Sequence, residues 1–264
     1  MLINLLNDVD NVTSIVPTRN LNLTYIILDS LFIVLFLALL IWKKRYATTI
    51  FALFGGILYF IVDFVGFYAI SHTRTVMIDN QVAGAGMTAA VLLWMSLSYG
   101  ITNFAFIWLC LKKDKYLVFW LFMIIGWWLM CPSIAELGVE ATIQTSRTTG
   151  AYHGWMAVAL IVGYFGLIIY SLYKKQKLVN ILWLCLIGFA VQFGWEFSLL
   201  INGIRPMNEA SIRTLIVNSF LETNLGMPYI YLIYLAYSKF FTEDLKKVVI
   251  KENTELVKNE SSEN

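Results

Sequence analysis

Seven long apolar runs, separated by short polar connections, dominate the pattern of this chain. A run of about 20 apolar residues is long enough to cross a bilayer as a helix. The sequence therefore predicts an all-α, polytopic membrane protein with seven transmembrane helices. They are expected at approximately Leu21–Trp42, Ala47–Ile70, Gly84–Leu111, Tyr116–Ile134, Gly154–Tyr173, Leu178–Ile201 and Leu215–Ser238.

The short connections leave no room for a separate soluble module. We expect an N-terminal segment at 1–20, a transmembrane domain at 21–240 and a charged tail at 241–264. The composition agrees with this division, because 59% of the residues are hydrophobic and only 14% are charged. A soluble domain would carry about 25% charged residues.

Positive residues are distributed unevenly between the two sides of the expected membrane. The connections after the first, third and fifth runs, together with the tail, hold 14 of the 19 lysines and arginines. Positive residues accumulate on the cytoplasmic side of membrane proteins. We therefore expect a multi-pass cell-membrane protein with its N-terminus outside and its C-terminus in the cytoplasm. The net charge of +2 reflects this asymmetry and does not suggest nucleic-acid binding.

The first three and last three runs show a weak internal repeat. Asp63 follows Lys44 by 19 residues and Glu196 follows Lys175 by 21 residues, each in the second run of its set. The third run of each set contains a glycine deep within it, Gly100 and Gly226. This pattern is consistent with a 3+1+3 parallel repeat, and parallel repeats occur in several transporter folds.

Four carboxylates lie inside the apolar runs: Asp29, Asp63, Glu196 and Glu222. A charged carboxylate in hydrocarbon costs at least about 2.5 kcal/mol, so such residues usually face a protein interior or a wet cavity. At a rise of about 1.5 Å per helical residue, they lie about 21–28 Å from the cytoplasmic ends of their helices. We expect them to converge in the outer half of the bilayer, although each one alone could reach headgroup water.

Converging acids allow two kinds of chemistry. Like charges and desolvation favour the protonated form of a carboxyl group, and a buried neutral carboxylic acid can donate a proton. Alternatively, Arg205 and Arg213 on the same side could pair with the acids. Such a network would be structural or would recognise a zwitterionic ligand.

We assign Asp63, Glu196 and Glu222 as candidate catalytic residues. The candidate substrate-binding residues are polar or aromatic neighbours in the same runs: Asp29, Asn218, Asn224, Trp195, Phe60 and Tyr59. The π faces of aromatic rings can stabilise a cation, although an interfacial belt would have the same composition. Asn218, Glu222 and Gly226 recur every four residues and so share one helix face, which interhelical hydrogen bonds would also explain.

The chain contains no motif for a metal, a nucleotide or a redox cofactor. The two histidines do not have the spacing of metal ligands. We therefore expect no cofactor and no metal. The expected partner is a membrane lipid or an apolar small molecule, and the oligomeric state stays open.

The segment 220–229, FLETNLGMPY, resembles the last helix of the small integral-membrane terpene cyclases of fungal meroterpenoid pathways. Those proteins are also seven-helix chains. They carry an acid followed four residues later by glycine in that helix, which Glu222 and Gly226 match, and a further acid in the second helix, which Asp63 matches. The family's second-helix acid normally follows a tryptophan, whereas here the tryptophan–acid pair is Trp195-Glu196.

This resemblance implies an acid-catalysed reaction. Glu222 or Asp63 would protonate an epoxide or alkene of an isoprenoid, aromatic rings would stabilise the carbocation, and another carboxylate would take the final proton. The sequence thus favours a membrane enzyme such as an isoprenoid cyclase. A small-solute transporter of the 3+1+3 type is the alternative, and a receptor or assembly protein ranks third.

Overall fold

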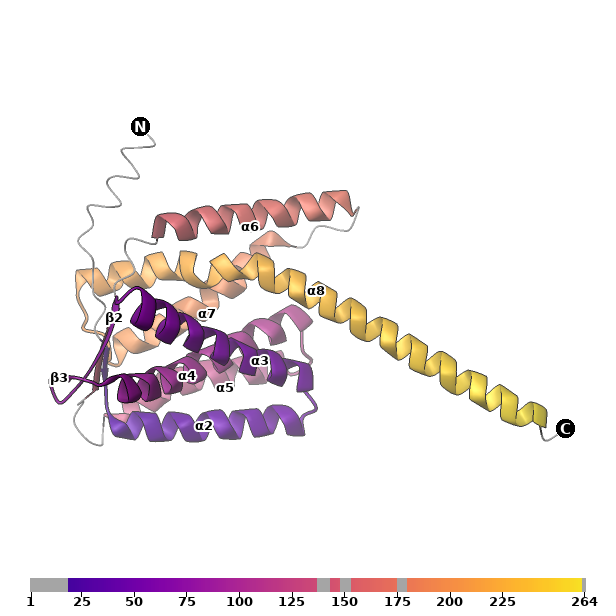
Figure 1. Ribbon diagram of the computed structural model, residues 1–264, viewed down its shortest axis with the longest axis horizontal. Coiled ribbons are helices and arrows are strands. Elements are labelled where there is room, and N and C mark those ends of the chain that lie inside the picture. Colours follow the sequence, from indigo (N-terminus) through magenta and orange to yellow (C-terminus); the bar gives the residue numbers. More distant parts are fainter. Residues whose placement is uncertain (1–18, 137–142, 148–152, 175–179, 263–264) are drawn as a thin grey trace.

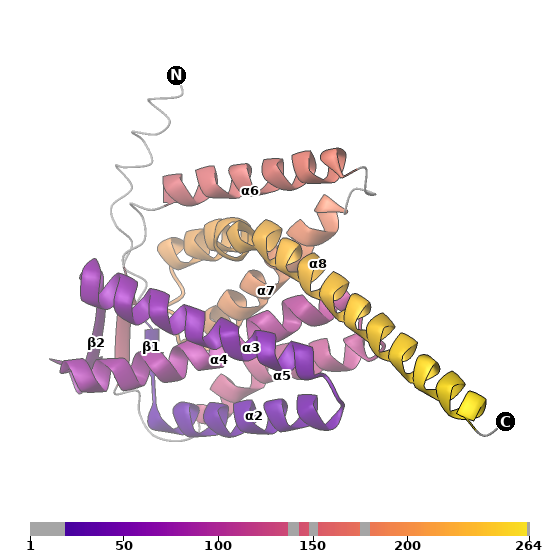
Figure 2. The same ribbon diagram turned by 45° about the vertical axis from the view of Figure 1, so that its right-hand side comes forward.

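The computed structural model describes residues 19–136, 143–147, 153–174 and 180–262. Within these ranges, seven long helices lie roughly along one axis (Figures 1 and 2). Six of them are long and apolar enough to cross a membrane, which confirms a multi-pass membrane protein. The helices are α2 (Leu23–Trp42), α3 (Tyr46–Phe60) with its continuation η1 (Ile61–Ile70), α4 (Ala85–Lys112), α5 (Leu117–Ala135), α6 (His153–Tyr173), α7 (Ile181–Ile201) and α8 (Glu209–Ser262).

Asparagine side chains set the start of two helices. The Asn22 carboxamide oxygen accepts a hydrogen bond from the Tyr25 N–H at 2.7 Å, which satisfies one of the free donors of the first turn of α2. Asn180 does the same for the Trp183 N–H at the start of α7. Leu21, which the apolar pattern placed in the first helix, therefore lies before it, in a short strand.

Helix α4 forms the centre of the bundle and is buried over most of its length. It packs closely against α3, where Gly100 of α4 meets Gly55 and Gly56. A Cβ atom on Gly100 would lie only 2.6 Å from the Gly56 Cα. Small residues let transmembrane helices approach closely, and this contact fixes η1 beside α4. Gly226 makes no such close contact, and on α7 it is Gly188 that lies against α8.

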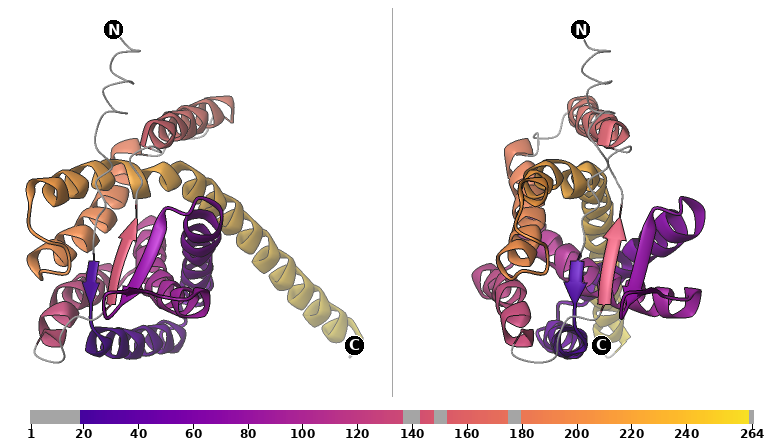
Figure 3. Two further views of the ribbon diagram at one scale, coloured as in Figure 1. Left: turned by 60° about the vertical axis from the view of Figure 1, so that its left-hand side comes forward. Right: turned by 90° about the vertical axis from the view of Figure 1, so that its left-hand side faces the viewer.

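A four-stranded antiparallel sheet lies across one end of the bundle and was absent from the sequence-based prediction (Figure 3). Its strands are β1 (Arg19–Leu21), β2 (Arg74–Ile78), β3 (Gln81–Val82) and β4 (Ile143–Arg147), in the order β1-β4-β2-β3. The β2–β3 turn consists of Asp79 and Asn80, both with positive φ, as a two-residue type I′ hairpin requires. We call this the sheet end of the molecule.

The opposite end carries most of the described lysines, on the α2–α3 connection, on the α4–α5 connection and after α6. We call it the lysine end. Helix α8 continues beyond it as a single helix to Ser262 (Figure 1). The expected charged tail thus extends α8, whereas the expected N-terminal segment 1–20 lies outside the described residues except for Arg19 and Asn20 of β1.

Candidate functional site: a carboxylate–arginine network

Three of the four predicted carboxylates meet at the sheet end of the bundle. Asp63 comes from η1, Glu196 from α7 and Glu222 from α8. Four arginines approach them from outside the helices: Arg19 on β1, Arg74 on β2, Arg147 on β4 and Arg205 after α7. The sheet therefore positions the positive charges, and the helices position the negative ones.

Asp63 is held by two arginines and a tyrosine. Its carboxylate lies 3.6 Å from Arg74 Nη2 and 3.5 Å from Arg147 Nη1. The Tyr99 hydroxyl on α4 donates to Asp63 Oδ2 at 2.5 Å. Arg74 and Arg147 are opposite each other in the β2–β4 register, which explains how both reach one carboxylate. Asp63 also lies in a ten-residue π-helical segment, a rare conformation that is frequent at functional sites.

Glu196 makes the tightest ion pair of the network. Arg205 Nε lies 2.6 Å from Oε2 and Arg205 Nη2 lies 2.9 Å from Oε1, which is the two-point geometry typical of strong arginine–carboxylate pairs. Arg19 Nη2 adds a contact of 3.4 Å to Oε1. The side chains of Glu196 and Arg205 are each only 2% exposed.

Glu222 is the more open member of the network. Among the described residues its arginine partner is Arg147, whose Nη2 donates to Oε1 at 2.8 Å. Gln192 Nε2 donates to Glu222 Oε2 at 3.0 Å and contacts Glu196 Oε1 at 3.5 Å, while its own oxygen accepts from the Thr223 hydroxyl. The Glu222 side chain is 18% exposed, against 2% for Asp63 and Glu196.

Two bridging residues join these contacts into one network. Arg147 links Asp63 to Glu222, and Gln192 links Glu222 to Glu196. Burial lowers the pKa of Arg74 to about 10 and also lowers that of Arg205, whereas for Arg147 the nearby Glu222 and Asp63 outweigh burial and raise the pKa. Four arginines thus face three carboxylates, and each of these carboxylates forms an ion pair. Of the two arrangements expected from the sequence, neutral acids or an acid–arginine network, the structure has the second. Arg205 takes part as expected, but Arg213 is exposed and forms no ion pair with a described carboxylate.

Aromatic rings line one side of the network. The Tyr59 ring lies 4.7 Å from the Tyr99 ring, which lies 5.9 Å from Trp195, and Trp195 lies 5.9 Å from Trp128. Tyr59 is also within electrostatic range of Glu222 and Asp63. Phe60 is not part of this wall, because it stacks on Phe64 along its own helix.

Asp29 does not join the network. It is 2% exposed on α2 and accepts a hydrogen bond from Trp127 Nε1 at 3.1 Å, and no described cation forms an ion pair with it. Among the described residues, neither candidate asparagine forms a hydrogen bond with the network: Asn218 is buried, and Asn224 accepts from the Tyr164 hydroxyl at 3.4 Å. Asn224 follows Glu222 by two residues, about 200° around the helix, and so faces the opposite side of α8.

The apolar pattern did not indicate Arg19, Arg74 and Arg147 as site residues, nor Tyr99 and Gln192. One signal for the arginines was available. All five positive residues assigned to the outer side are arginines, whereas the other side holds every lysine. Arginine, with its planar, weakly hydrated guanidinium group, is the usual choice for buried ion pairs.

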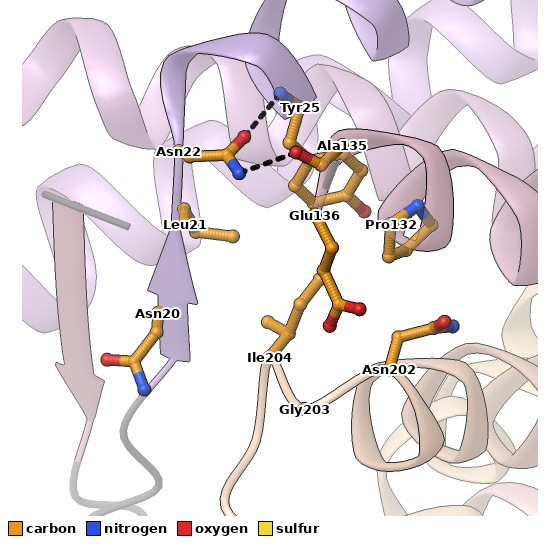
Figure 4. Close-up of a pocket in the computed structure, with 10 residues that line it drawn as sticks. All are labelled: Asn20, Leu21, Asn22, Tyr25, Pro132, Ala135, Glu136, Asn202, Gly203 and Ile204. Atoms are coloured by element: carbon orange, nitrogen blue, oxygen red, sulfur yellow. Dashed lines mark hydrogen bonds between the residues drawn. The ribbon is translucent and has the colours of Figure 1, made fainter. Parts of the chain in front are cut away.

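A small polar pocket lies beside the network at the sheet end, where β1, α2, α5 and α7 come together (Figure 4). Its volume is about 100 Å³ and the Glu136 carboxylate points into it. Asn22 on its wall donates to the Ala135 carbonyl and accepts from the Tyr25 N–H. The pocket contains none of the predicted site residues.

At the lysine end, an ion pair joins two connections. Arg45 Nε lies 2.5 Å from Asp114 Oδ2, and the Tyr116 N–H donates to Asp114 Oδ1 at 2.9 Å. Burial opposes ionisation of Asp114, but these partners together hold its pKa below the usual range. This cluster fixes the α2–α3 connection against the α4–α5 connection and is structural.

The fold and the network define a multi-pass integral membrane protein with buried charged residues at one end of its bundle. No protein-family model, curated protein or solved structure matches the chain.

Proposed function

We propose that the protein is a membrane-embedded enzyme that transfers a proton between Glu222 and a lipid-soluble isoprenoid, cyclising it. One observation carries the proposal: Glu222 is the network carboxylate with the most open side chain, 18% exposed against 2% for Asp63 and Glu196. A group that exchanges a proton with a substrate must be reachable from the substrate.

Glu222 shares its arginine with a second carboxylate. Arg147 also contacts Asp63, so its charge stays paired when Glu222 takes up a proton. Glu196 and Asp63 each keep two arginine contacts and are more enclosed. We assign Glu222 as the catalytic group and these two carboxylates as positioning residues.

The aromatic residues beside Glu222 supply the second requirement of a cyclase. A carbocation formed by protonation of an alkene or epoxide needs nearby π electrons and no competing water. Tyr59, Tyr99 and Trp195 present such rings next to the network.

The resemblance to membrane terpene cyclases also supports this proposal. Its two matched acids, Asp63 and Glu222, contact the same arginine, Arg147. Positions far apart in the sequence are thereby joined at one guanidinium group. We extend the proposal to topology: α8 is the seventh span, the sheet end is extracytoplasmic and the lysine end is cytoplasmic, in line with the positive-inside rule.

A transporter of the 3+1+3 type is the second candidate. The observation that favours it is the correspondence of two helix pairs, since α3 packs on α4 and α7 packs on α8 more extensively than any other helices. Saturable uptake of a small solute by proteoliposomes would support this candidate over the enzyme.

The proposed enzyme is tested with the Glu222→Gln variant. Membranes holding the wild-type protein are incubated with prenylated and epoxyprenylated aromatic compounds, and cyclised products are detected by mass spectrometry. We expect product formation to fall by about 100-fold or more in Glu222→Gln, the scale of general acid–base catalysis. Glu209→Gln, at an exposed site on the same helix, is the matched control and should retain full activity.

Two results would contradict the proposal. One is an unchanged product yield in a Glu222→Gln protein that is folded and inserted like the wild type. The other is the absence of any cyclised product from the whole substrate panel with wild-type membranes.

A further inference from the structure

A large hollow lies between α6, α7 and α8, away from the carboxylate–arginine network. Its volume is about 710 Å³, within the range of small-molecule sites. The walls are almost entirely apolar and include Phe165 on α6, Leu186 and Phe189 on α7, and Phe220 on α8. Figure 2 shows α6 set apart from the rest of the bundle, with α8 as its neighbour.

Helix α6 contacts the bundle mainly through α8. The Tyr229 hydroxyl on α8 donates to the Ala159 carbonyl at 3.2 Å, and Gly163 lies against the Tyr229 ring. Among the described elements, α6 has no comparable contact with α7. The hollow therefore separates two helices that, among the described elements, are joined mainly through α8.

The few polar groups in the hollow already have partners. The Tyr164 hydroxyl donates to Asn224 Oδ1, and Asn224 Nδ2 donates to the Ser219 carbonyl, both at 3.4 Å. An apolar cavity without free polar groups does not hold water. Its occupant must therefore be apolar.

The mouth of the hollow opens on the surface that faces lipid. Phe165 is 62% exposed, Leu182 67% and Phe220 59%. Because α6 and α7 are both candidate membrane spans, the medium at this mouth is hydrocarbon. The walls are formed by large side chains, whereas close contacts between transmembrane helices favour small ones. A flexible chain fits these walls better than another helix.

We propose that this hollow is a binding site for one acyl chain of a membrane phospholipid. The chain fills the space between α6 and α7 and ties α6 to the bundle. The site is independent of the proposed enzymatic activity, because Phe220 and Asn224 face about 200° away from Glu222 around α8.

Photolabelling tests the site. The full-length protein is reconstituted with phosphatidylcholine that carries a diazirine in one acyl chain, solubilised, washed in detergent and then irradiated. We expect adducts on peptides of α6 and α7, because a bound chain survives washing, and few on the open surface of α2. Leu186→Trp, which fills the hollow, should reduce these adducts several-fold. Leu35→Trp on α2, where the residue is 60% exposed, is the matched control and should leave them unchanged.

A second measurement does not depend on a variant. Cys185 lines the hollow and is partly accessible, while Cys110 and Cys131 are buried. A bound acyl chain should shield Cys185 from N-ethylmaleimide, and exhaustive delipidation should raise its labelling rate several-fold. The proposal is wrong if α2 and the hollow label equally after washing, if delipidation leaves the Cys185 rate unchanged, or if Cys185 cross-links to Cys185 of a second copy.

Discussion

Each buried charge at the sheet end depends on a specific opposite charge. Glu196 and Arg205 are both 2% exposed and meet through two short contacts. Removing one member of such a pair leaves an uncompensated buried charge, which costs about 3–5 kcal/mol. Replacing both members with apolar residues is far less costly, because the desolvation of two ions is then avoided.

A double-mutant cycle at this pair tests that dependence. Glu196→Leu and Arg205→Leu should each destabilise the protein by about 3–5 kcal/mol, and the double variant should cost clearly less than their sum. Thermal unfolding in detergent, followed by the loss of monodisperse protein, provides the comparison. Purely additive losses would mean that the two side chains act separately.

Individual acids could be predicted from sequence better than their partners. Asp63, Glu196 and Glu222 stand out because they interrupt apolar runs, and they do converge. Arg147 could not be assigned, because it reaches Asp63 only through the pairing of β4 with β2, across 84 positions of the chain. Asp29 interrupts an apolar run in the same way, yet it lies apart with Trp127.

Among the secondary-structure elements, the helices could be predicted from local sequence, whereas the strands could not. The predicted helix limits agree with the observed ones to within about three residues for the first six spans, because length and hydropathy are local properties. The strands have only two to five residues; β1 lies just before α2, and the other three lie in connections between helices. Their alternation is too short to be recognised, and their partners are distant in sequence.

The α3–α4 contact gives a prediction about packing between elements. Gly100→Ala should destabilise the protein by about 1–3 kcal/mol, the usual cost of overpacking, because the added Cβ meets the Gly56 Cα at 2.6 Å. Gly126→Ala is the matched control, since a Cβ there meets nothing within 4 Å and alanine favours the helix. The same thermal assay in detergent compares them, and equal stability of the two variants would show that α3 and α4 can separate at no cost.

At the scale of the whole molecule, the two ends differ in both charge chemistry and structure. Four arginines at the sheet end, Arg19, Arg74, Arg147 and Arg205, pair with carboxylates, whereas lysines at the other end lie in exposed connections. Exposed lysines in short connections indicate the cytoplasmic side of a membrane protein, whereas arginines buried in ion pairs do not. The topology proposed above therefore rests on the lysine end.

Cysteine labelling can determine this topology. Asn80→Cys places a thiol in the exposed β2–β3 turn, and Lys113→Cys places one in the exposed α4–α5 connection; both positions have positive φ and are equally constrained. A membrane-impermeant maleimide added to intact cells should label only the first variant, and permeabilisation should reveal the second. The reverse pattern would invert the protein in the membrane.

The strand order has a consequence for biosynthesis. β4 lies between β1 and β2 in the sheet, although it is made after both of them. While the chain emerges from the ribosome, Asp63 is made long before Arg147, and the facing edges of β1 and β2 stay open until the segment after α5 has been made. A nascent chain stalled before residue 143 would hold the four helices α2 to α5, with Asp63 still lacking Arg147 and Arg19 still lacking Glu196. The charged cluster is complete only after α7 and α8, which carry Glu196 and Glu222, have followed.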